Sequence, residues 1–80
     1  MKAVSELQVR KTLQAIPSWA RVLPHITDDT PFADCGMDSL ALLELVSELQ
    51  GAYGVEIPDD DVEKIASISD TARYLNTCIA

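Results

Sequence analysis

With 80 residues, 48% of them apolar, and a formal net charge of −7, the chain can build one small domain with a modest core, and we expect residues 1–80 to form that single domain. Two cysteines are too few for a disulfide scaffold, so we expect Cys35 and Cys78 to be free thiols in a reducing, cytoplasmic setting. No apolar run is long enough to span a membrane, and the charged start MKAVSELQVRK does not fit a secretory signal.

The charges are unevenly distributed along the chain. No Lys or Arg occurs between Val22 and Glu63, and this stretch contains 11 of the 13 acidic residues. Such a surface repels nucleic acid and anionic lipid and attracts basic partners, so we expect neither nucleic acid nor a membrane as a partner. The alternative is that the acids serve solubility alone. Because the sequence gives no sign of an obligate oligomer, we expect a monomer.

The first predicted helix spans residues 3–16 and ends before Pro17. A long connection, PSWARVLPHITDDTPFADCGM, follows, and its three prolines exclude one continuous helix. So long a connection in so small a chain should have a packing or functional role. We expect Ser18 to cap a single turn, Trp19–Leu23. The side chains expected to fold over the core are Trp19, Leu23, Ile26 and Phe32.

The second helix is predicted over residues 39–53, with Gly54 as its C-terminal cap. Its core stripe follows the i, i+3, i+4, i+7 pattern and consists of Leu42, Leu45, Val46, Leu49 and Tyr53. Leu40 and Leu43 fall on another face, beside Ser47 and next to Glu44 and Glu48. The helix therefore has a core face and a second face that mixes leucines with acids.

Two further helices are predicted after the extended segment VEIP. The acids Asp59–Asp61 open a short helix, because acids favour the first turn, and its Val62, Ile65 and Ala66 should pack inward. A metal site at these acids is the less favoured alternative, since neighbouring side chains diverge and no EF-hand spacing is present. A capping box at 67–70 starts the last helix. Its core line is Ile68, Ala72, Leu75 and Ile79.

These elements predict an all-α fold: a small four-helix bundle with three longer helices, one short helix and a long loop between the first two. Within it, Ser39 could act as a nucleophile, cap a helix or be modified. Catalysis is disfavoured because His25 is the only histidine and no glycine follows Ser39 at the spacing of a nucleophile elbow, so we expect no catalytic residues. Either Asp38 or Ser39 should cap the second helix, and a phosphate ester on Ser39 would be favoured there. Gly36 allows the tight turn before it.

From Ile26 to Leu75 the sequence resembles the acyl carrier proteins. The resemblance rests on the box FADCGMDSL, the acidic and apolar helix that follows, then IPDDD and the segment IASISD, in this order and spacing. It implies that a phosphopantetheinyl transferase attaches 4′-phosphopantetheine from coenzyme A to Ser39, whose neighbours are Gly36, Asp38 and Leu40. In the family the aspartate helps the transferase to bind, with Mg²⁺ on the transferase side.

The resemblance also implies how such a carrier works. The thiol of the arm holds acyl groups as thioesters, and the apolar interior between the second and third helices would shelter them. The partners would be an acyl-loading ligase or acyltransferase and a ketosynthase or other acyl-processing enzyme with a basic docking surface. The protein itself would be no enzyme and would bind no metal of its own. The residues that would contact partners are Leu40, Leu43, Glu44, Ser47, Glu48, Asp59 and Asp60.

The sequence departs from the family pattern at several positions. Cys35 replaces the usual leucine and should still pack as a small apolar side chain. Ala41, Gln50 and Gly51 stand where fatty-acid carriers are often acidic, which favours a specialised carrier of a polyketide or mixed pathway. An aminoacyl or peptidyl carrier ranks lower because that family more often has Gly-Gly-x-Ser and lacks IPDDD. An acidic interaction module that is never modified is the alternative from another class.

Overall fold

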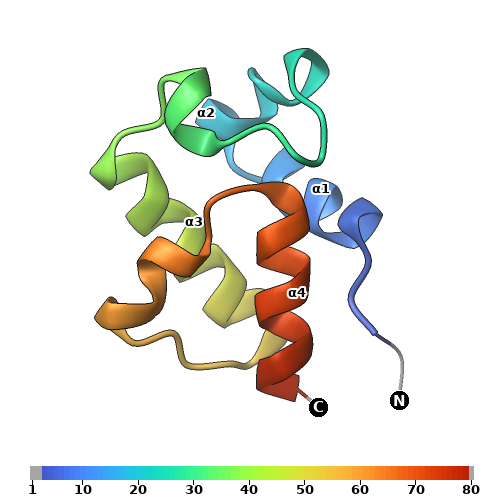
Figure 1. The fold of residues 1–80 in the computed structure, drawn as a ribbon, viewed down its shortest axis with the longest axis vertical. Helices are drawn as coiled ribbons and strands as arrows, with labels where there is room; N and C mark the ends of the chain where they lie inside the picture. Colours follow the sequence, from blue (N-terminus) through green and yellow to red (C-terminus); the bar gives the residue numbers. More distant parts are fainter. Residues whose placement is uncertain (1–2, 80) are drawn as a thin grey trace.

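The computed structural model describes residues 3–79, and Figure 1 shows their helices joined by turns and extended segments. The long helices are α1 (Glu6–Gln14), α3 (Ser39–Tyr53) and α4 (Ile68–Ile79), and the short fourth helix is the 3₁₀ helix η3 (Asp59–Lys64). The connection between α1 and α3 contains α2 (Pro17–Ala20), η1 (Leu23–His25) and η2 (Phe32–Cys35). The predicted all-α bundle, with a long first connection, is confirmed.

Helix α1 begins later than the sequence pattern predicted, because its cap lies inside the expected helix. Ser5 Oγ accepts a hydrogen bond from the Gln8 N–H at 3.2 Å, and Gln8 Oε1 accepts one from the Ser5 N–H at 2.9 Å. This capping box leaves Ser5 extended, so the prediction of a start at Ala3 was wrong. The helix ends before Ile16, which is extended because the following proline disfavours helical backbone.

The predicted turn over residues 19–23, capped by Ser18, was also wrong. Helix α2 begins at Pro17, with Ile16 as its N-cap and no side-chain cap. Proline suits this position because the first helical N–H has no partner within the helix and the proline ring fixes a helical φ. Leu23 belongs to η1 instead, whose second residue is again a proline.

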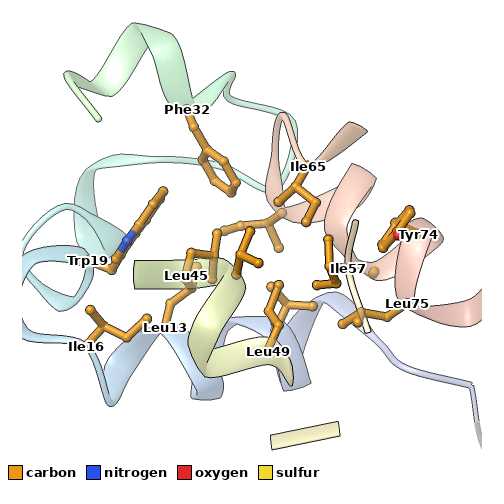
Figure 2. Close-up of a cluster of buried hydrophobic side chains, with 14 of the residues drawn as sticks. Leu13, Ile16, Trp19, Phe32, Leu45, Leu49, Ile57, Ile65, Tyr74 and Leu75 are labelled. Carbon is orange, nitrogen blue, oxygen red and sulfur yellow. The ribbon is translucent and has the colours of Figure 1, made fainter. Parts of the chain in front are cut away.

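Trp19 and Phe32 anchor the long connection in the core (Figure 2). Their rings meet edge to face, with centroids 4.7 Å apart and an interplanar angle of 74°. The indole Nε1 of Trp19 donates to the carbonyl of Ala41 at 3.0 Å, which fixes α2 against the first turn of α3. The prediction that this connection folds over the core is therefore confirmed, with Leu23 buried and Ile26 packed partly against it.

The core of the helices follows the predicted stripes with a few exceptions. Leu42, Tyr53 and Ile79 are only half-buried, whereas Ala41 is buried. Ala66 is exposed, contrary to prediction, because Ile65 leaves helical geometry (φ −94°, ψ 76°) and turns the chain away before α4 begins. The other buried stripe residues are Leu45, Val46, Leu49, Ile65, Ile68, Ala72 and Leu75.

Arg10 fastens the long connection to α1. Its Nε lies 2.8 Å from Asp28 Oδ1, and its terminal nitrogens donate to the carbonyls of Leu23 and Ile26. The Asp28 carbonyl in turn accepts from the Ser69 N–H at 2.9 Å, at the start of α4. The connection is thereby held between α1 and α4. Across residues 3–79, the helices are too short or too polar for any of them to cross a bilayer.

Candidate functional site

Ser39 is the first residue of α3 and is exposed, directly after the cap of the helix. Asp38 is that cap: its Oδ1 accepts from the Ala41 N–H at 3.0 Å, and its carbonyl accepts from the Leu42 N–H at 3.1 Å. The sequence left Asp38 and Ser39 as alternative caps, and the structure selects Asp38. The Ser39 hydroxyl is therefore not needed to cap the N-terminus of α3.

A tight turn at Gly36 delivers the chain to this cap. Gly36 has φ +79° and ψ 15°, a left-handed conformation that glycine adopts without steric cost. Its N–H donates to the carbonyl of Phe32, which closes η2, and the Met37 N–H bonds to the same carbonyl at 3.4 Å. The buried Phe32 thus fixes the position from which α3 starts.

Backbone contacts on two sides hold the beginning of α3. The Phe32 N–H donates to the Ala66 carbonyl at 2.8 Å, which ties η2 to the segment between η3 and α4. On the other side, the Trp19 indole donates to the carbonyl of Ala41, in the first turn of α3. Ser39 itself is exposed, whereas η2 before it and the first turn of α3 after it are held by packing and hydrogen bonds.

A hollow of about 310 Å³ opens beside Ser39. Ser39, Leu42 and Leu43 line it from α3, and Asp59 and Val62 line it from η3. Its lining is mainly apolar side chains from helices that are distant in sequence. In Figure 1, η3 (orange) lies in front of α3, to the left of α4.

The second face of α3 is turned to solvent. Leu40 is 68% exposed and Leu43 is 53% exposed, two of the three exposed large hydrophobic residues of the described chain. Glu44 and Ser47 are exposed and Glu48 is half-buried. A second hollow, of about 440 Å³, separates this face from the end of α1. Its other wall, residues 15–17, was missed from the sequence because the two walls are brought together only by the fold.

Asp61 and Tyr74 form a contact that sequence reasoning did not find. The Tyr74 hydroxyl donates to Asp61 Oδ2 at 2.7 Å, and Lys64 Nζ lies 3.2 Å from Asp61 Oδ1. The hydrogen bond from Tyr74, followed by that from Lys64, lowers the pKa of Asp61. Burial and the bond to Asp61 raise the pKa of Tyr74. A tyrosine on a core helix needs a partner for its hydroxyl, which was the available signal.

Cys35 lies half-buried in η2 and packs against the core, as predicted. Its thiol donates to the Phe32 carbonyl at 3.1 Å. Burial raises the pKa of the Cys35 thiol, so little reactive thiolate forms near neutrality. Cys78 is exposed, and both thiols are free.

The chain is a small all-α domain with an exposed serine at the start of a helix and an apolar hollow beside it. A family model described as a phosphopantetheine attachment site matches residues 11–75, from within α1 to within α4. The chain belongs to this family: it is a non-catalytic carrier protein that bears covalent 4′-phosphopantetheine. Such carriers work with a phosphopantetheinyl transferase and with acyl-processing enzymes.

Proposed function

We propose that the chain is an acyl carrier whose attachment residue is Ser39. The observation that carries the proposal is the position of Ser39: exposed, first in α3, and lining the apolar hollow formed with η3. When bound, the arm supplies a thiol that holds the acyl group as a thioester. The free N–H groups at the start of α3 favour an anion, which suits the phosphodiester.

The neighbours of Ser39 suit a covalent arm. The Asp38 carboxylate would repel a phosphodiester, but its Oδ1 is engaged by the Ala41 N–H. We assign Asp38 two roles, as the cap of α3 and as a contact for the transferase. Gly36 sets the approach of the chain, and Leu40 projects into solvent next to the attachment point.

We propose the second face of α3 as the docking surface for the processing enzymes. It combines the exposed Leu40 and Leu43 with the carboxylates of Glu44 and Glu48, and Ser47 lies between them. Exposed leucines flanked by acids fit a partner surface in which basic residues surround an apolar patch. Asp59 and Asp60, both exposed on η3, extend the acidic surface past Ser39.

The loading experiment tests Ser39 directly. The protein is incubated with coenzyme A, Mg²⁺ and a promiscuous phosphopantetheinyl transferase, and its intact mass is measured. We expect the mass of one phosphopantetheine to be gained by the native chain and by Ser18→Ala, a control serine exposed on α2, but not by Ser39→Ala. Gain of the same mass by a folded Ser39→Ala protein would place the attachment elsewhere.

For the pathway, we propose a specialised carrier of polyketide or mixed type. The positions on α3 where fatty-acid carriers often have an acid are Ala41, which is buried, Gln50, which is half-buried, and Gly51, which is exposed. The end of α3 at Gln50 and Gly51 therefore presents less negative charge to a partner. A primary fatty-acid ketosynthase should therefore elongate the acylated protein slowly. Elongation at the rate of a fatty-acid carrier would contradict this assignment, and loading by an adenylation domain would favour the peptidyl alternative.

A further inference from the structure

Helix η3 is weakly held for an element that lines the hollow beside Ser39. It is a 3₁₀ helix of six residues, its N-cap Pro58 offers no side-chain cap, and none of its residues is buried. Its anchors in the core lie just outside it, at Ile57 before the helix and Ile65 after it. Between these anchors, the partly buried Val62 packs against the core, and the rest of the helix depends on polar contacts for its position.

Hollows lie on both sides of this helix. The hollow toward α3, about 310 Å³, is lined from η3 by Asp59 and Val62. The hollow toward α4, about 550 Å³, is lined from η3 by Asp61, Glu63 and Lys64. The hollows on both sides leave η3 room to shift once it is released from α4, and such a shift would let the hollow beside Ser39 widen.

One side-chain contact opposes such movement. Within residues 3–79, the side-chain hydrogen bond that joins η3 to another element runs from the Tyr74 hydroxyl to Asp61 Oδ2, at 2.7 Å. Tyr74 is buried on α4 (Figure 2), so the donor is fixed in place. The acceptor is directly followed by Val62, which lines the hollow beside Ser39. Displacing Asp61 therefore displaces one wall of that hollow.

We propose that the Tyr74–Asp61 hydrogen bond is a latch that sets the distance of η3 from α3 and thereby the length of acyl chain that the protein shelters. Tyr74 and Asp61 are positioning residues, since they act through Asp59 and Val62. A volume of about 310 Å³ is at the lower end for ligand pockets, so the latched protein shelters short acyl groups. The cargo part of this proposal rests on the proposed attachment at Ser39, whereas the latch itself does not.

The first test uses Tyr74→Phe in the unmodified protein. This change removes the hydroxyl and keeps the buried ring. Hydrogen exchange is followed at the amides of Asp61 and Ile65, which bond to the carbonyls of Pro58 and Val62 at 2.9 and 3.0 Å. We expect exchange there to accelerate on the order of tenfold, as for loss of a hydrogen bond to a charged group, with α1 and α3 unchanged.

The matched control is Tyr53→Phe. The Tyr53 hydroxyl lies 3.2 Å from Thr12 Oγ1 and joins α3 to α1, so the same substitution here removes a tyrosine hydrogen bond, between neutral groups, away from η3. This variant should leave exchange in η3 as it is in the native protein. Unchanged exchange of η3 in Tyr74→Phe, or an equal acceleration in every helix, would overturn the latch, because the hydroxyl would then have no local role.

The second test concerns cargo. The loaded proteins carry acyl groups from acetyl to dodecanoyl, and the rate of thioester cleavage by hydroxylamine reports how far each chain is sheltered. We expect Tyr74→Phe, unlike Tyr53→Phe, to slow the cleavage of long acyl groups relative to the native protein. Identical chain-length profiles would overturn the cargo inference. Absence of loading at Ser39 would instead count against the proposed function, and the exchange result would stand separately.

Discussion

At the scale of single residues, Asp38 caps α3 and leaves Ser39 free for the attachment role that we propose for it. The Asp38 carboxylate accepts a hydrogen bond from the Ala41 N–H, one of the N–H groups at the start of α3 that have no partner within the helix. Ser39, one position later, is left exposed and available for modification. A serine that also capped the helix would become a weaker acceptor for the backbone N–H once its oxygen was esterified. With the cap on Asp38, modification of Ser39 need not loosen the helix.

Substitution of Asp38 separates its structural role from its role in loading. Asp38→Ala should lower the free energy of unfolding by about 1 kcal/mol, because the cap is lost, whereas Asp38→Asn should lower it by only a few tenths, since asparagine caps equally well. Urea unfolding measures both. We expect both variants to load slowly, because both lack the carboxylate proposed to contact the transferase. Rapid loading of a folded Asp38→Asn protein would remove that second role.

At the scale of elements, the turn from η2 into α3 determines where Ser39 stands. The turn depends on the left-handed backbone of Gly36 and on the burial of Phe32, four residues earlier. An added Cβ at Gly36 would meet no atom within 4 Å, so the requirement for glycine comes from the backbone angle rather than from crowding. The same absence of contacts holds at Gly51, whose backbone is helical.

These two glycines give a paired prediction on stability. Gly36→Ala should lower the free energy of unfolding by about 1–2 kcal/mol, the cost of a left-handed alanine. Gly51→Ala should raise it by about 0.5–1 kcal/mol, because alanine favours the helix interior. Chemical denaturation of both variants beside the native protein is the measurement. A Gly36→Ala protein as stable as the native one would mean that η2 ends in some other geometry.

At the scale of the whole molecule, long-range polar contacts hold the irregular segments to the helices. Arg10 joins α1 to the long connection, Asp28 continues to α4, and Asp61 joins η3 to α4. Arg10 and Tyr74 each donate to a carboxylate of the acidic stretch, whereas the contact of Asp28 with α4 uses its backbone carbonyl. In a chain with a net charge of −7, the Arg10–Asp28 ion pair also reduces the repulsion among the acids.

The Asp61 contact should appear in the dependence of stability on pH. Because folding lowers the pKa of Asp61, through Tyr74 first and Lys64 second, its contribution is present above the unfolded pKa of about 3.9 and is lost as the pH falls through the folded value. Asp61→Asn should therefore be less stable than the native protein near neutrality, and this difference should shrink below about pH 4. Urea midpoints measured across this range test the prediction.

Asp60→Asn is the control for the loss of one negative charge, since Asp60 is exposed on the same helix. It should not reproduce the loss of stability of Asp61→Asn near neutrality. A difference between Asp61→Asn and the native protein that stayed constant down to the most acidic conditions would contradict the assignment. The stability would then depend on the shape of the side chain at position 61 and not on its charge.

Local patterns in the sequence determined much of this protein. Apolar periodicity located the core of α3 and α4, the prolines broke the long connection, and the series from FADCGMDSL to IASISD indicated the family from sequence alone. These features are local because a helix stripe or a turn depends on residues a few positions apart. The capping box SELQ was equally local, but the first helix was predicted to begin two residues before it.

Only the tertiary structure decided how distant segments meet. The choice of Asp38 as cap depends on the exact entry of the chain into α3, which the buried Phe32 and Gly36 fix. The wall that residues 15–17 form opposite α3 and the Tyr74–Asp61 bond both join positions whose spacing follows no helical period. The exposure of Ala66 likewise depends on where the chain turns after η3. Hydrophobic burial is non-directional, so a sequence pattern shows which side chains are buried but not which neighbours they meet.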